Sequence, residues 1–118
     1  MSEKPEKPSA TIEKKQHAVI ARAMNKLEDE DHLKSLMRMI DEAVVSETGV
    51  SLVIVDLSRV TIIPSLALGM LVQISNKCKA RQQKLKLAGV NPQLRQVFSI
   101  TRLDRVFEFT PDVEGAME

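Results

Sequence analysis

The sequence is poor in aromatic residues, with no tryptophan, no tyrosine and only three phenylalanines among 118 residues. This scarcity argues against sites that stack nucleic-acid bases or cage cationic ligands on aromatic rings. A single cysteine, Cys78, excludes an intramolecular disulfide and is typical of a reducing compartment. No stretch approaches the roughly 20 consecutive apolar residues of a membrane span, and the charged, proline-containing beginning of the chain is unlike a signal peptide. These absences predict a cytoplasmic protein with no membrane partner.

An excess of charge of either sign is missing as well. Lysine and arginine number 17, aspartate and glutamate 16, and the formal net charge is +1. A surface that neutralises nucleic-acid phosphates normally has a basic excess, so we expect no nucleic-acid partner. Residues arranged for catalysis are scarce too, because neither His17 nor His32 has a nearby serine or cysteine in a nucleophile motif. Four scattered glycines form no phosphate-binding loop, and no cysteine–histidine spacing suggests zinc. The sequence predicts no enzyme, no catalytic residue, no metal and no cofactor.

The length and the 43% share of apolar residues suit one domain with its own core. Residues 1–9 are rich in Lys, Glu and Pro and are predicted to form a disordered tail, which leaves 10–118 as the domain. A first strand is expected to begin at Thr11 and Ile12, and a second over 17–24. The apolar, β-branched run 52–55 predicts a strand buried on both faces.

Further strands are expected at residues 84–88, where apolar and polar residues alternate, and at 106–109. Helices are indicated between the strands by apolar residues at helical spacing: Leu33, Leu36, Met37, Ile40 and Val44, then Ala67, Met70, Leu71, Ile74 and Cys78, then Leu94, Val97 and Phe98. Asn91-Pro92 and Thr110-Pro111 are typical helix starts, and Gly49 is a typical residue after a helix end. The order β-β-α-β-α-β-α-β-α predicts one layered α/β domain with a mixed, mostly parallel sheet of four to five strands and about four helices.

Two charged runs have simple structural interpretations. The acidic run 28–31 precedes a helix, where negative charge is favourable, and this is preferred to a divalent-metal cluster. The basic run 77–86 is interpreted as a solvated helix end followed by the outer face of a strand. Cys78 lies on the apolar side of a helix and is interpreted as a buried hydrophobic residue rather than a nucleophile.

Ser65 is the most informative polar residue because it stands where the strand 52–55 gives way to a helix. From the local sequence the favoured interpretation is structural: the hydroxyl caps the helix, which is worth roughly 1 kcal/mol. The alternative is functional. A phosphate on Ser65 would meet the free N–H groups and the positive end of the helix dipole, and its charge beside Leu66 could abolish a hydrophobic docking contact.

Two segments carry a resemblance to a known family. The segment VIVDLSRVTIIPSLALGML over 53–71 has a buried strand, a short hydrophobic stretch and a helix that opens on serine. It is similar to the central motif of the STAS domain family of anti-sigma factor antagonists. The segment KLKLAGVNPQLRQVFSITRLDRVFEF over 84–109 is similar to the strand, helix and final strand that follow in the family. The resemblance covers residues 10–118, and before residue 53 it consists only of the order of elements.

The resemblance implies a STAS-like fold and a function in partner switching. In this family the unphosphorylated domain binds a serine kinase that is also an anti-sigma factor, the kinase phosphorylates it, and a phosphatase reverses the change. Transferred by position, Ser65 is the phosphoacceptor, Gly69 is the small residue one helical turn later, and Glu28 is the acidic residue before the first long helix. The partner-binding residues are then expected to be Glu28, Thr61, Pro64, Ser65, Leu66, Leu68 and Gly69. The protein is expected to be a monomer or a weak dimer.

Three positions depart from the family pattern. Pro64 replaces the aspartate before the phosphoacceptor, Leu66 replaces the second serine, and Ala67 replaces the following glycine. Pro64 removes a charge and a backbone donor, while Leu66 makes the helix start more apolar. Two alternatives therefore stay open: a domain that senses a small ligand, a nucleotide or a lipid, in a groove near Ser65, and an unphosphorylated scaffold in a signalling assembly.

Overall fold

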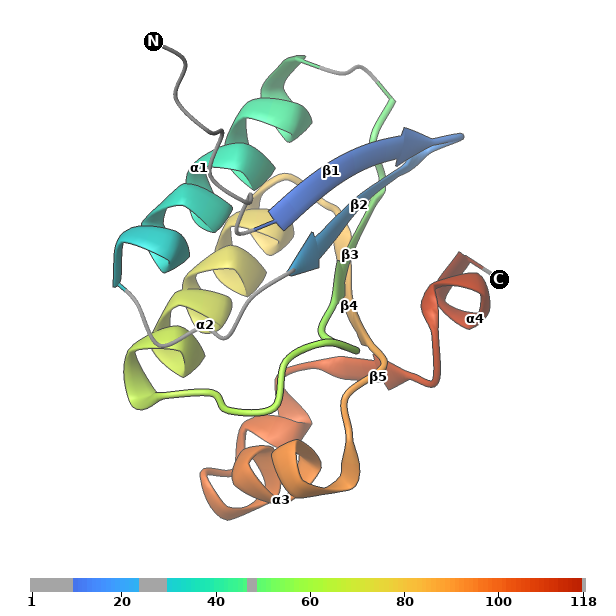
Figure 1. Ribbon diagram of the computed structural model, residues 1–118. Coiled ribbons are helices and arrows are strands. Elements are labelled where there is room, and N and C mark those ends of the chain that lie inside the picture. Colours follow the sequence, from blue (N-terminus) through green and yellow to red (C-terminus); the bar gives the residue numbers. More distant parts are fainter. Residues whose placement is uncertain (1–9, 24–29, 47–48, 118) are drawn as a thin grey trace, which may run out of the picture.

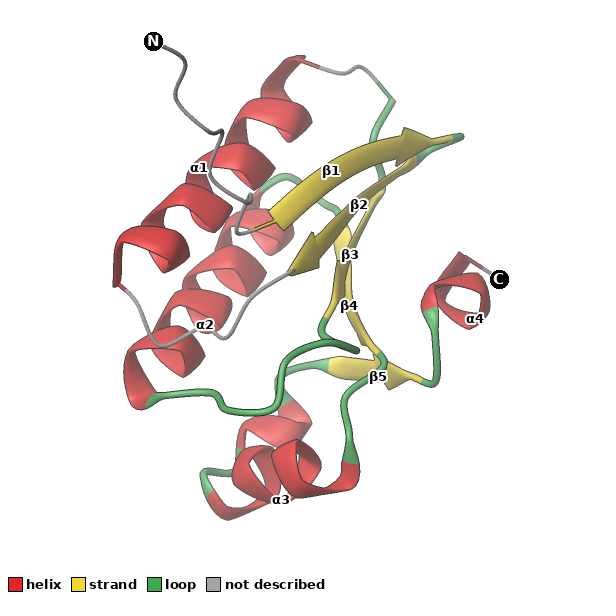
Figure 2. Ribbon diagram, viewed as in Figure 1, coloured by secondary structure: helices red, strands yellow, loops and turns green. Residues whose placement is uncertain are grey.

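The computed structural model describes residues 10–23, 30–46 and 49–117. Figures 1 and 2 show strands and helices alternating along the chain in the predicted order; their bounds are β1 (Ala10–Lys15), β2 (Ala18–Ala23), α1 (Glu30–Ser46), β3 (Leu52–Asp56), α2 (Ser65–Ala80), β4 (Lys84–Ala88), α3 (Pro92–Ile100), β5 (Glu108–Thr110) and α4 (Val113–Met117). The predicted α/β fold class is therefore confirmed.

The strands form one five-stranded sheet in the order β1-β2-β3-β4-β5. β1 pairs antiparallel with β2, and the remaining neighbours are parallel. Each parallel connection steps to the next strand in the same direction, so right-handed crossovers place α1, α2 and α3 on the same face. Figure 1 shows α1 and α2 packed along this face and α4 on the opposite side of the sheet.

β3 is buried on both faces, as its sequence predicts. Val53 and Val55 belong to the main core with α1, α2 and α3, whereas Leu52 and Ile54 belong to a smaller cluster with α4. All four side chains are at most 6% exposed. This double burial explains why the strand is a continuous apolar run instead of an alternating one.

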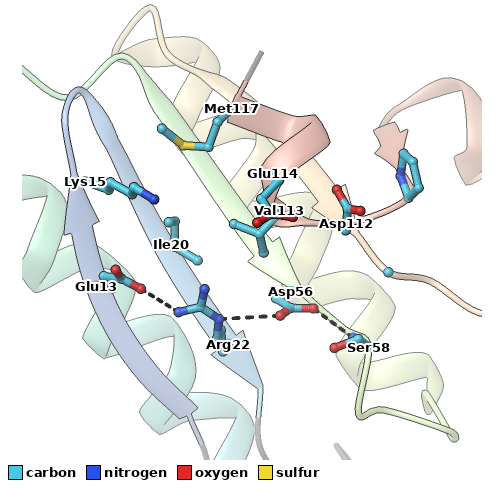
Figure 3. Close-up of a pocket in the computed structure, with 12 residues that line it drawn as sticks. Glu13, Lys15, Ile20, Arg22, Asp56, Ser58, Asp112, Val113, Glu114 and Met117 are labelled. Atoms are coloured by element: carbon cyan, nitrogen blue, oxygen red, sulfur yellow. Dashed lines mark hydrogen bonds and ion pairs between the residues drawn. The ribbon is translucent and has the colours of Figure 1, made fainter.

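The face of the sheet under α4 is only partly apolar. Ala116 is fully buried against a narrow strip of small and branched residues, and its carbonyl oxygen accepts a hydrogen bond of 3.0 Å from Lys86 Nζ. Charged side chains lie on this face around the strip, among them Glu13, Arg22 and Asp56 (Figure 3). A single five-residue helix thus covers the centre of this face and leaves polar surface on either side of it.

Several details differ from the expectations. The final strand begins at Glu108, not at 106, because a 3₁₀ turn over Leu103–Arg105 precedes it, which the sequence patterns do not predict. The second strand is described from Ala18 onwards, and the preceding Gln16 turns the hairpin with a positive φ of 58°. The predicted tail over 1–9 lies outside the described residues.

The basic run 77–86 is solvated at the end of α2, as predicted, but the prediction is wrong for Lys86 of β4, whose side chain is only 11% exposed because it lies against α4. Lys77 Nζ lies 2.8 Å from Asp41 Oδ2 of α1, and Arg81 Nη1 lies 3.8 Å from Oδ1 of the same carboxylate. Lys79 and Lys84 are exposed. Within the described ranges no helix is both long enough and apolar enough to cross a membrane.

Candidate functional site

The loop between β3 and α2 is held firmly from the inside. The backbone N–H of Leu57 donates to the Ala88 carbonyl at 2.9 Å, and Asp56 Oδ1 accepts from the Ser58 N–H at 3.0 Å. Gly89 packs so closely against this turn that a β-carbon there would lie 2.8 Å from the Ser58 β-carbon. The loop therefore presents its outward side chains from a fixed backbone.

Side chains along this loop divide between the core and the surface. Val60 and Ile63 are buried, whereas Thr61 and Ile62 are exposed. Ile62 keeps 46% of its surface accessible, so the loop directs one large apolar side chain outward. Ile62 is not among the predicted partner-binding residues, because two adjacent isoleucines carry no periodicity that distinguishes the buried one from the exposed one.

Ser65 is the first residue of α2 and its side chain is exposed. The favoured interpretation of its hydroxyl as the helix cap is wrong. Pro64 occupies the cap position with extended backbone angles, φ −76° and ψ 166°, and the helix has no side-chain cap hydrogen bond. Because Ser65 already has helical backbone angles, its hydroxyl is not in the cap position, from which a side chain reaches back to the N–H groups of the first turn.

The beginning of α2 is suited to negative charge. The Leu68 N–H donates to the Pro64 carbonyl at 3.2 Å, so the N–H groups of the three residues before it precede the first helical hydrogen bond. The first turn contains no acidic side chain that would offset the positive end of the helix dipole. An anion on the Ser65 oxygen would therefore be placed at an uncompensated helix start.

The outward side of the helix start is uncharged. At about 100° per residue, Ser65, Leu66 and Gly69 lie on the outer side of α2, whereas Leu68 turns inward and is 7% exposed. Leu68, which is predicted to contact a partner, therefore has little accessible surface for such a contact. Leu66 retains 46% of its surface and Gly69 meets nothing within 4 Å of a built β-carbon.

We call the exposed residues Thr61, Ile62, Ser65, Leu66 and Gly69, together with the half-buried Pro64, the α2 entry surface. It brings together five of the seven predicted partner-binding residues and adds Ile62. Of the other two, Leu68 faces inward and Glu28 lies outside the described residues. This surface combines two accessible apolar side chains, Ile62 and Leu66, with the hydroxyls of Thr61 and Ser65 and contains no charge, which suits docking on another protein.

A separate hollow of about 310 Å³ lies between α4 and the β1–β2 side of the sheet (Figure 3). Across it Arg22 Nη1 is 2.6 Å from Glu13 Oε1, and Arg22 Nε is 3.6 Å from Asp56 Oδ2. The hydrogen bond and charge of Arg22 hold the pKa of the Glu13 carboxyl below its usual range. Ser65 does not line this hollow, so it is distinct from the groove expected beside that residue.

Other reactive groups are sparse in the part of the chain that the structure describes. It contains no group of three or more His, Cys, Asp or Glu side chains that could hold a metal ion. Cys78 is buried, and this burial raises the pKa of its thiol to about 11. The interpretation of Cys78 as a buried hydrophobic residue is confirmed, since the thiolate that nucleophilic chemistry needs is disfavoured.

Comparison with known proteins agrees with this fold. The sequence model of the STAS domain matches residues 11–116. Three solved structures are similar, each with 19% identity: an anti-sigma factor antagonist from Mycobacterium paratuberculosis (TM-score 0.77, covering 92% of this chain and 89% of that chain), the phosphorylated form of Bacillus SpoIIAA (TM-score 0.68, 89% and 94%), and a chain of the stressosome, a signal integration and transduction hub (TM-score 0.68, 91% and 92%). The resemblance inferred from residues 53–71 and 84–109 is therefore confirmed over almost the whole length: the chain belongs to the STAS domain family.

Proposed function

We propose that this protein is a cytoplasmic regulatory module of the anti-sigma factor antagonist type, which docks on a protein partner through the α2 entry surface. The observation that carries the proposal is an exposed serine at the start of α2, between two accessible apolar side chains, Ile62 and Leu66. Support also comes from the similar structure in Mycobacterium paratuberculosis, which is an anti-sigma factor antagonist. The partner is an anti-sigma factor that is also a serine kinase.

Phosphorylation of Ser65 is the proposed switch. A phosphate brings a charge of about −1.5 to −2 at neutral pH. In the free protein the uncompensated start of α2 would stabilise this charge, since the first turn has no acidic residue. In the docked state the same charge would lie among the apolar contacts of Leu66 and would lose its hydration, which opposes docking. Removal of the phosphate by a phosphatase restores the docking surface.

Bacillus SpoIIAA, a similar protein, has a phosphorylated form, which supports a search for the same modification here. The test is intact-mass spectrometry of the purified protein after incubation with ATP and lysate of its native host. We expect one added phosphate in the wild type and none in Ser65→Ala. A Ser99→Ala variant, which removes an exposed serine of α3, is the matched control and should still be modified. Modification that persists in Ser65→Ala would reject this residue as the acceptor.

Docking is tested separately with apolar variants. Leu66→Ala removes an exposed side chain from the α2 entry surface, and Ile100→Ala removes one that is 80% exposed at the end of α3. Burial of a whole leucine side chain is worth about 1.5–3 kcal/mol, so burying the exposed 46% of Leu66 contributes roughly 0.7–1.4 kcal/mol, about three- to tenfold in affinity. We expect weaker capture of the kinase by Leu66→Ala only. Equal capture by both variants would contradict docking through this surface.

A scaffold without phosphorylation is the second candidate. Pro64 at the cap of α2 favours it, because a kinase that reads an acidic residue before the acceptor would find none. The similar chain of the stressosome belongs to a signalling assembly, which fits such a role. Capture of the partner by Ser65→Glu as strong as by the wild type, without modification of Ser65, would favour the scaffold over the switch.

A further inference from the structure

A second hollow lies at the opposite end of the sheet from the α2 entry surface. Its volume is about 500 Å³, which is within the range of small-molecule sites. It is lined at the amino ends of the strands by His17 before β2, Ser51 and Leu52 at β3, and Gln82 and Lys84 at β4. Ser65 follows the carboxyl end of β3, so the two regions are separated by the length of the strands.

Five of the residues that line the hollow can donate hydrogen bonds, and none of the described residues that line it is acidic. Lys84 and Lys86 alternate with two leucines along β4, so both lysines lie on the α4 side of the sheet. Among the described residues the Lys84 ammonium group has no hydrogen bond or ion pair. His17, Ser51 and Gln82 add side chains that can donate to an anion with several oxygens.

Lys86 is nearly buried and is held in place. Its side chain is 11% exposed, donates to the Ala116 carbonyl at 3.0 Å and lies 3.6 Å from Glu108 Oε2. An ammonium group has three N–H bonds, so one donor remains beyond these two partners. The Lys86 ammonium group therefore has a fixed position at the edge of the hollow and one N–H that these two partners do not use.

Two apolar side chains complete the hollow. Leu52 is 6% exposed at its floor, and Met117 of α4 is half-buried. Figure 3 shows the Met117 side chain extending from α4 over the sheet. The hollow thus combines a cationic rim with an apolar floor, which fits an anionic group joined to a small hydrophobic group.

We propose that this hollow binds a small, freely diffusing phosphomonoester that carries a short apolar group. The phosphate oxygens contact Lys84 and Lys86, and the apolar group covers Leu52 and Met117. A phosphate offers three acceptor oxygens and most of two negative charges, which the two lysines and the neighbouring donors of the rim can bind. This binding site is independent of the proposed docking function, since it shares no residue with the α2 entry surface.

The test uses hexyl phosphate as the probe in a two-dimensional amide NMR titration. We expect shifts at Ser51, Leu52, Lys84 and Met117 and none at Ser65. Inorganic phosphate should bind more weakly, because it lacks the apolar group that covers Leu52 and Met117. Hexanol should not bind at all, because it lacks the phosphate that contacts the lysines. Binding should be unchanged in Ser65→Glu, which separates this site from failure of the proposed docking function.

Charge variants decide whether the lysines act specifically. Lys84→Gln should weaken binding of hexyl phosphate at least threefold, since one charge-assisted contact is lost. Lys79→Gln, which removes an exposed lysine on α2 outside this hollow, should leave it unchanged. Equal weakening of hexyl phosphate binding in both variants would mean that only the net charge of the protein matters, and it would overturn the proposal.

Two further experiments test whether the neighbouring carboxylate blocks the hollow and whether the lysines bind a lipid surface instead. Glu118 directly follows Met117 in the sequence and supplies a carboxylate, so the titration is repeated with Glu118→Gln. Absence of binding in both the wild type and this variant overturns the proposal. Sedimentation with vesicles of phosphatidic acid and phosphatidylcholine, without binding of hexyl phosphate, would assign the lysines to a lipid surface and overturn it as well.

Discussion

A single negative charge at position 65 should make the fold more stable. In Ser65→Glu the carboxylate lies at the first residue of α2, where no other acidic side chain offsets the helix dipole and no side chain caps the helix. Such a charge stabilises a helix start by about 0.3–1 kcal/mol at an exposed position. Glutamate and glutamine have similar helix propensities, so Ser65→Gln isolates the contribution of the charge.

The measurement is urea denaturation followed by circular dichroism in low salt. With a denaturant slope of about 1–3 kcal/mol per molar, 0.5 kcal/mol moves the midpoint by roughly 0.2–0.5 M. We expect Ser65→Glu to have the higher midpoint of the pair. The gap should shrink in about 1 M salt, where the screening length is about 3 Å.

The control places the same charge where no dipole end is near. Gln96 is exposed in the middle of α3 and has no lysine or arginine three or four residues away, so Gln96→Glu should change stability very little. A midpoint for Ser65→Glu equal to or below that of Ser65→Gln, or a gap that salt does not reduce, would refute the electrostatic account of the helix start. Weaker partner capture by the more stable Ser65→Glu would separate the proposed switch from simple loss of folding.

Three further outcomes are expected from the fold. Gly89→Ala should lower the free energy of unfolding by at least about 2 kcal/mol in urea denaturation, because its φ of +72° and the 2.8 Å distance from a built β-carbon to the Ser58 β-carbon both exclude a side chain. Gly69→Ala, in open space within a helix, should raise the free energy of unfolding by about 0.5–1 kcal/mol. Equal effects of the two substitutions would contradict this explanation. Burial raises the Cys78 pKa from 9.0 to about 11, so between these pH values the unfolded state ionises first and the free energy of unfolding should fall as pH rises, a slope that Cys78→Ala should reduce. Phe98→Ala should cost about 3–5 kcal/mol in the same assay, since this ring is fully buried and meets two other phenylalanine rings edge-to-face; a loss below about 1 kcal/mol would mean that the packing is not as described.

The order of elements could be predicted because the signals were local. The apolar run 52–55 and the alternation over 84–88 each have the period of a strand, and both strands are present. The helix start predicted at Asn91-Pro92 is also confirmed, because Asn91 Oδ1 caps α3 by accepting a hydrogen bond of 2.8 Å from the Leu94 N–H. The start of the final strand was predicted less accurately, because the 3₁₀ turn before β5 depends on packing between α3 and the sheet.

The candidate site was predicted in part. Ser65 was correctly expected to be exposed at a helix start, and Leu66 was correctly expected beside it. The predicted position of the helix cap was wrong by one residue, because Pro64 rather than Ser65 occupies it and proline adopts the extended cap conformation as readily as serine does. The burial of Leu68 and the exposure of Ile62 could not be predicted, because the direction in which the anchored loop enters α2 decides which apolar side chains face the core.

The sequence alone determined the alternation of strands and helices, the family to which the chain belongs and the place of Ser65, because period, turn chemistry and motif order are properties of neighbouring residues. Tertiary structure decided which apolar side chains stay accessible beside Ser65. It also decided that Lys84 and Lys86 of β4 meet Met117 of α4 around one hollow. Residues more than thirty positions apart become neighbours only when the sheet register and the final helix are set, and no local pattern encodes that arrangement.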